Sequence, residues 1–159
     1  SYLGLEQVVE IENWTPDLLW SLAHGVAADP YAGLDRFDRV IDLRWSCCNF
    51  GGASSSDGSS SGSDCQRTLL EQIRYGYDRA GNRVWREMPV AASNGVNLDE
   101  LYRYDGLHRL VDFNRGDLNA THDTIYPLAR KQQWELDATG NWSRFVQFDE
   151  SDAALALDQ

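Results

Sequence analysis

The chain has 159 residues, about the size of one domain, with 14 basic and 25 acidic side chains and a formal net charge of −11. This acidic balance argues against a protein that grips nucleic acid phosphates or an anionic membrane surface, since both need a basic face. Because 42% of the residues are apolar and 11% aromatic, the composition also argues against a disordered chain. No apolar run is long enough for a membrane-spanning helix. From the charge we therefore expect no nucleic-acid partner, and from the short apolar runs we expect no membrane insertion.

The first third of the chain predicts strands. Leu18, Trp20 and Leu22 occupy alternate positions within the segment 16–27, a spacing typical of a strand. The same alternation continues at Ile41, Leu43 and Trp45, and it returns around 73–77, 102–104, 111–113 and 134–136.

An internal repeat lies between these strands. Four segments align without gaps, each with an Asp, two variable residues, a turn residue and then Arg or Asn. They are Gly33–Val40, Gly76–Arg83, Arg103–Leu110 and Glu135–Trp142. A weaker copy opens the chain at Tyr2–Val9, so turns are predicted near 3–7, 35–39, 78–82, 105–109 and 137–141.

Each repeated segment has the chemistry of a hairpin turn. The Asp carboxylate can accept a hydrogen bond from the backbone N–H two residues on. Three residues after the Asp the chain needs a positive φ, which Gly adopts freely and Asp and His adopt more readily than most residues. The predicted structural turn residues are Asp35, Asp38, Asp78, Gly81, Asp105, His108, Asp137 and Gly140. The pattern predicts an all-β fold of consecutive antiparallel β-hairpins.

A polar segment interrupts the pattern. Residues 51–64 are rich in Ser and Gly and predict a flexible insert. Cysteines 47, 48 and 65 flank it, and we expect three free thiols; the alternative is a bridge from Cys65 to Cys47 or Cys48. The tail 151–159 is expected to begin a helix or to be frayed.

The repeated segments resemble the YD repeats, also called RHS repeats. Tyr75–Arg83 matches the pattern Tyr-x-Tyr-Asp-x-x-Gly-Asn, and Tyr102–Leu110 departs from it at His108. The run Asp29–Phe37 resembles segments of large planctomycete members of the family, and the resemblance covers residues 1–150. The resemblance implies that the β-hairpins form a curved open sheet. Such a sheet would be part of a shell around a toxin-like domain, or part of a secreted or cell-surface protein. The expected partner is the remainder of a longer YD-repeat polypeptide or the enclosed domain, because so few hairpins cannot close a shell.

Other functions are weighed against this structural one. The four repeated aspartates could be acid–base groups or calcium ligands, but catalysis needs one constellation rather than one residue per repeat. The run Asp29–Leu34 is similar to a self-cleavage motif of the family with one residue too many, and we expect no cleavage there. Glycan contact through the aromatic residues Trp85, Trp134 and Trp142 is the main alternative, and cross-strand packing is the preferred interpretation of these side chains.

We therefore predict a non-catalytic structural segment with no cofactor and no metal. The runner-up is a carbohydrate-binding or adhesive surface module. A third hypothesis, a hydrolase with paired carboxylates, would need two acids about 5–10 Å apart beside a cleft.

Overall fold

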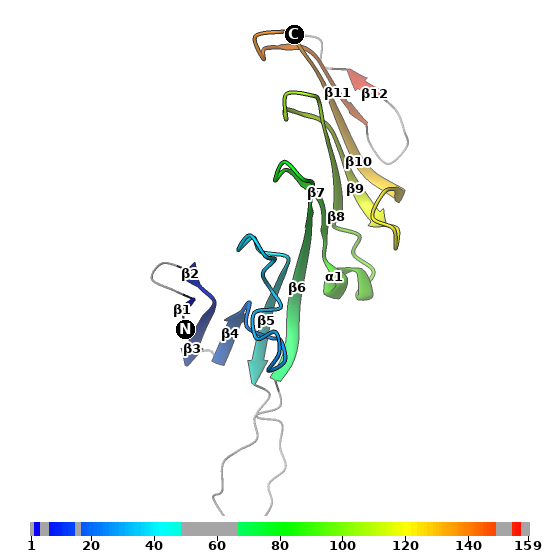
Figure 1. The fold of residues 1–159 in the computed structure, drawn as a ribbon. Helices are drawn as coiled ribbons and strands as arrows, with labels where there is room; N and C mark the ends of the chain where they lie inside the picture. The colour runs from blue at the N-terminus through cyan, green and yellow to red at the C-terminus, as the bar shows by residue number, and fades with distance from the viewer. Residues whose placement is uncertain (1, 4–6, 15–16, 49–66, 149–153, 157–159) are drawn as a thin grey trace, which may run out of the picture. The chain divides into compact units, whose positions relative to one another are not determined.

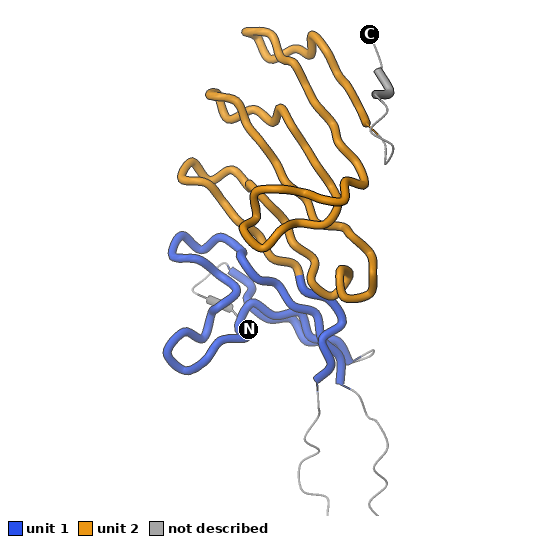
Figure 2. The backbone as a smooth tube through the Cα atoms, turned by 90° about the vertical axis from the view of Figure 1, so that its right-hand side faces the viewer, with its two compact units in different colours: residues 1–72 blue, residues 73–159 orange. Residues whose placement is uncertain are grey.

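The computed structural model describes residues 2–3, 7–14, 17–48, 67–148 and 154–156. The chain divides into two compact units, residues 1–72 and residues 73–159 (Figure 2). The flexible insert predicted at 51–64, Cys65 and the centre of the weak first turn, residues 4–6, lie outside the described residues.

Unit 1 contains short antiparallel strands (Figure 1). Strands β1 (Tyr2–Leu3) and β2 (Gln7–Val8) pair as a separate ribbon. Strands β3 (Glu10–Trp14), β4 (Asp17–Ser21) and β5 (Asp42–Cys48) pair in that order. Two apolar side chains form the buried centre of the unit: Val9 and Leu22 are each 1% exposed, and the Leu22 N–H donates to the Val9 carbonyl over 2.8 Å.

Unit 2 is an open antiparallel sheet in which every strand pairs with its neighbours in sequence. Strand β6 (Arg67–Tyr77) enters it, followed by β7 (Arg83–Glu87), the short helix α1 (Pro89–Ser93) and β8 (Asp99–Tyr104). The remaining strands are β9 (Leu110–Leu118), β10 (Ile125–Leu136), β11 (Trp142–Phe148) and β12 (Ala154–Ala156). Among the described residues no helix has the length and apolarity to cross a bilayer.

The register of unit 2 gives its sheet two chemically different faces. One face carries aromatic pairs and charged side chains, because Tyr102 lies opposite Phe113 and Arg86 lies opposite Glu100. On the other face Trp85 lies opposite Leu101. Among the residues of this unit whose burial is described, the buried apolar side chains are few: Leu101, Leu118 and Val146. A sheet with so small a core depends on cross-strand pairs and on its turns for much of its stability.

The fold class predicted from the repeat is confirmed, because the described chain is nearly all-β and its strands form open antiparallel sheets. Two expectations are wrong. Part of the tail forms strand β12, which pairs Ala156 with Val146 and is neither helical nor frayed. Cys48 is disulfide-bonded and is not a free thiol.

Candidate functional site: the hairpin turns

Four turns in the structure share one backbone geometry. In each, the Asp N–H donates to the carbonyl four residues on over 2.9 Å, and the N–H three residues on returns a bond of 3.0–3.2 Å to the Asp carbonyl. These turns are Asp35–Arg39 in unit 1 and Asp78–Asn82, Asp105–Arg109 and Asp137–Asn141 in unit 2. Asp35 thus begins the same turn as the other three aspartates.

The fourth residue of each turn lies in the left-handed region of φ. Asp38 and His108 have φ values of 60° and 62°, and Gly81 and Gly140 both have 92°. An L-residue with a Cβ pays a steric cost of about 1–2 kcal/mol there, whereas Gly pays none. Two of the four turns therefore have a strained residue at this position, Asp38 or His108, and the other two have an unstrained glycine.

The Asp carboxylate of each turn is bound within its own turn. In Asp78, Oδ1 accepts the N–H of Ala80 over 2.9 Å and that of Asn82 over 2.8 Å. Its Oδ2 accepts from the Asn82 side-chain amide over 2.8 Å. The equivalent donors for Asp35, Asp105 and Asp137 come from the same two backbone positions and from the side chain of Arg39, Arg109 or Asn141.

These hydrogen bonds keep the aspartates ionised. The Asn82 amide lowers the pKa of Asp78, and the Arg109 N–H and guanidinium lower the pKa of Asp105. The Thr139 hydroxyl, together with backbone N–H groups, lowers the pKa of Asp137 from 3.8 to about 2. For Asp35, burial opposes the shift, but donation from Arg39 still lowers the pKa. A general acid at neutral pH needs the opposite shift.

Neighbouring turns of unit 2 touch one another. Figures 1 and 2 show the three turns side by side at the same end of the strands. The Asn82 amide lies 3.0 Å from His108 Nδ1, and Arg109 Nη1 donates to the Asp137 carbonyl over 2.8 Å. Within unit 1, the Gln7 amide donates to the Asp38 carbonyl over 3.2 Å. The turn residues thus join successive hairpins as well as closing their own.

A further turn that sequence reasoning missed joins β9 to β10. Asn119 replaces the Asp: its Oδ1 accepts the N–H groups of Asp123 and Thr124 over 3.0 and 3.2 Å. His122, three residues after Asn119, has a φ of 57° and donates its N–H to the Asn119 carbonyl. The signal was present in the sequence as Asn with His three residues later, since both types tolerate turn geometry.

Glu100 is the centre of a charged cluster that the sequence did not indicate. Its side chain is 5% exposed and lies 3.0 Å from Arg86 Nη2 and 2.5 Å from Arg115 Nη2. It also accepts the Tyr102 hydroxyl. Burial, followed by the bond to Glu100, raises the pKa of Tyr102 to about 12. The two arginines satisfy this acid, so it is suited to holding strands together.

The three candidate glycan contacts lie in different surroundings. The Trp85 ring is stacked on His122 with centroids 4.1 Å apart, and Trp134 packs on Phe145 at 5.6 Å. Only Trp142 of the three is strongly exposed, at 67%, and it too stacks on Phe145. Trp134 and Trp142 share this partner, whereas Trp85 lies on a different strand pair.

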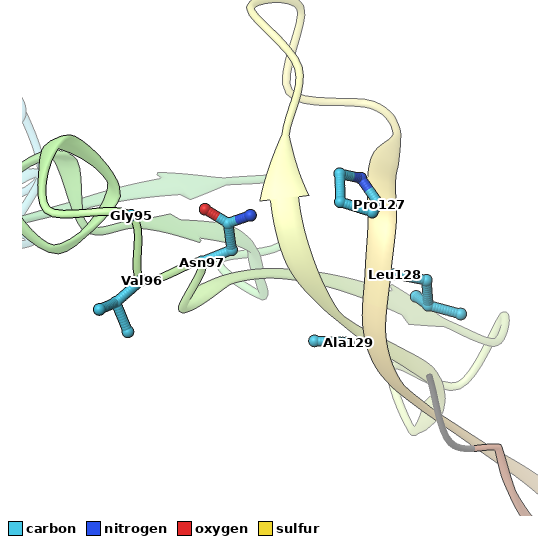
Figure 3. A pocket seen from close by; sticks show the side chains of 6 residues that line it. All are labelled: Gly95, Val96, Asn97, Pro127, Leu128 and Ala129. Carbon is cyan, nitrogen blue, oxygen red and sulfur yellow. The ribbon is translucent and has the colours of Figure 1, made fainter. Parts of the chain in front are cut away.

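Other sites offer little chemistry. Asp29–Leu34 is folded as successive turns, in which the Leu34 N–H donates to the Tyr31 carbonyl over 2.9 Å. Within the described residues, no three His, Cys, Asp or Glu side chains are grouped to hold a metal. A hollow of about 500 Å³ lies in unit 2 (Figure 3), and the residues that line it carry no acid, base or nucleophile. They are Gly95, Val96, Asn97, Pro127, Leu128 and Ala129.

Comparison with known proteins gives a likeness of fold. No family model matches the chain, and no curated protein matches it. A solved structure of the Tc holotoxin pore of Photorhabdus luminescens, in a mutant of its TccC3 component, is similar over 96% of this chain with a TM-score of 0.59 and 15% identity. The chain spans 7% of the length of that solved chain. At this identity the likeness concerns the fold alone.

Proposed function

We propose that the chain is a non-catalytic structural segment of an RHS-like hairpin wall that encloses or displays another domain. The observation that carries the proposal is the repeated turn. All four aspartates accept bonds from their own turns, so the most regular acids of the sequence serve the backbone. A repeated, internally satisfied group is what a scaffold requires, whereas catalysis requires one distinct constellation.

The open strand order supports a role within a longer polypeptide. An exposed sheet edge presents unpaired N–H and C=O groups, which favour pairing with a further strand. A neighbouring hairpin would provide that strand, and the likeness to a small part of a much longer toxin chain fits this view. The proposed partner is the remainder of a longer YD-repeat polypeptide or an enclosed toxin-like domain, and the proposed location is secreted or at the cell surface.

Imaging of the natural polypeptide tests this function. The polypeptide that contains this sequence would be purified from its source and its structure determined by cryo-electron microscopy. We expect these hairpins within a continuous wall of further hairpins, with a separate domain inside or beside it. A free-standing module with no hairpin neighbours would overturn the proposal.

A glycan array distinguishes the adhesive alternative. Trp142 is the best placed of the three candidate side chains because it is the most exposed. Selective binding that Trp142→Ala abolishes would favour a carbohydrate-binding module. The wall segment predicts no selective binding to any glycan on the array.

A further inference from the structure

The loop between β9 and β10, residues 119–124, reaches across the sheet of unit 2. The strand order is β10–β9–β8–β7, yet the ring of His122 lies on Trp85 of β7. The loop therefore spans β8 to make this contact. The two rings are nearly parallel, with an interplanar angle of 10° and centroids 4.1 Å apart.

Both ends of this contact are held in position. The Asn119 side chain closes the loop, and the positive φ of His122 turns the chain beside it. At the base of the loop, the buried carboxylate of Asp99 accepts the Leu118 N–H over 3.3 Å. On the sheet, the Trp85 indole lies so close to Gly76 that a Cβ there would be 2.0 Å from Nε1. Gly76 thus leaves the space that Trp85 occupies beneath the loop.

A carboxylate lies next to the stacked imidazole. His122 Nε2 is 4.0 Å from Glu87 Oε1, and their side chains are 31% and 24% exposed. Glu87 is shared with Arg74 of β6, whose Nη1 is 3.3 Å from its other oxygen. Five other charged side chains, three acids and two bases, lie at the base of the loop or line the hollow beside it. They are Asp123 in the loop, Asp99 and Arg103 on β8, Asp112 on β9 and Lys131 on β10.

We propose that this loop is a clasp on the sheet that tightens when His122 becomes protonated. Histidine is the side chain whose charge ordinarily changes between pH 5 and 8. A cationic imidazolium binds the face of an indole more strongly than neutral imidazole does. It also gains an ion pair with Glu87, which Arg74 weakens but does not abolish. The same change of charge strengthens both contacts, so acidification holds the loop more firmly on β7.

Nuclear magnetic resonance of the intact chain tests the clasp. The indole N–H signal of Trp85, assigned with Trp85→Phe, would be followed from pH 8 to pH 5 together with the exchange protection of the amides of residues 120–124. We expect the indole signal to titrate and loop opening to become about fivefold rarer at pH 5.5 than at pH 7.5. His122→Asn, which tolerates the positive φ, should remove both effects.

His108→Asn is the matched control, since His108 has nearly the same φ but contacts Asn82 instead of a Trp ring. This variant should behave as the unaltered chain does. An indole signal that does not titrate, or one that still titrates in His122→Asn, would overturn the clasp. In Glu87→Gln the rise in amide protection of the loop on acidification should be smaller than in the unaltered chain. A rise of the same size would refute the ion-pair part of the proposal.

Discussion

At the scale of residues, the turns divide two tasks between fixed positions. Asp78 satisfies the N–H groups of Ala80 and Asn82, and Gly81 takes the left-handed φ that reverses the chain. Asp105 and His108 occupy the same two positions in the next hairpin, although His is bulkier than Gly. The Asp position is therefore constrained by hydrogen bonding, and the fourth position is constrained by backbone conformation.

Gly140→Ala should lower the free energy of unfolding by about 1–2 kcal/mol, because a Cβ is strained at a φ of 92°. Crowding does not contribute, since the nearest atom to that Cβ would be Arg109 Nη1 at 3.8 Å. The control is Gly106→Ala in the neighbouring turn, where nothing lies within 4 Å and φ is not positive. Urea unfolding of both variants measures the difference, and equal effects would contradict the strain.

Acid should weaken the turns. Folding lowers the pKa of Asp137 from 3.8 to about 2, so its contribution to stability is present above pH 4 and is lost as the pH falls towards 2. Asp137→Asn should therefore flatten part of the dependence of stability on pH in this window. Thermal unfolding at pH 2, 3, 4 and 6 tests this, and a variant with the full acid dependence of the unaltered chain would argue against it.

These turn positions could be located from the sequence because their chemistry is local. The residues that accept a positive φ are few, and they recur at one spacing from an Asp. The turn at Asn119 was not predicted because its first residue is Asn, whereas the aligned segments all have Asp at this position. The contacts of His108 with Asn82 and of Arg109 with Asp137 depend on which hairpins become neighbours in space, and the repeat alone does not specify that.

At the scale of elements, β8 is held by polar groups on both of its faces. Glu100 lies between Arg86 of β7 and Arg115 of β9. Asp99, 3% exposed, accepts the Met88 N–H after β7 and the Leu118 N–H at the end of β9. The alternation of the sequence predicted a strand here. It did not predict that both acids are buried, because acidic side chains are mostly exposed and burial depends on partners from other strands.

Glu100→Gln should destabilise unit 2 by about 2 kcal/mol, because it leaves two arginines beside a neutral amide in a largely buried place. Glu135→Gln is the matched control: its partner Arg144 is equally close, but the two side chains are 64% and 56% exposed. That change should cost less than about 0.5 kcal/mol. Chemical denaturation of the two variants compares them, and similar losses would contradict the buried cluster.

Gly76→Ala should cost about 1–3 kcal/mol, since the new Cβ would overlap the Trp85 indole and force it to move. Adding Trp85→Val should recover part of that loss, because the smaller side chain removes the overlap. Unfolding free energies of the single and double variants form the test. Simple additivity of the two losses would show that the two residues do not interact.

At the scale of the whole molecule, the fold class could be predicted because a hairpin is formed by residues that are close together in the sequence. Period-two strands and a shared turn are both local signals, and the observed strands pair with their sequence neighbours in each unit. The helix Pro89–Ser93 was missed because it is too short for a periodic signal. Strand β12 was missed because Ala154–Ala156 carries no alternation, and it forms by pairing with β11.

The central claim is that the repeated acids are turn acceptors and not members of a reactive centre. Carbon-13 resonances of the side-chain carboxyls of Asp35, Asp78, Asp105 and Asp137 can be followed in the intact chain as the pH is lowered. Hydrogen bonding within each turn predicts that all four pKa values lie below 3.8, with Asp137 near 2. A pKa at or above the ordinary aspartate value for any of them would reveal an acid poised for chemistry and would contradict the scaffold.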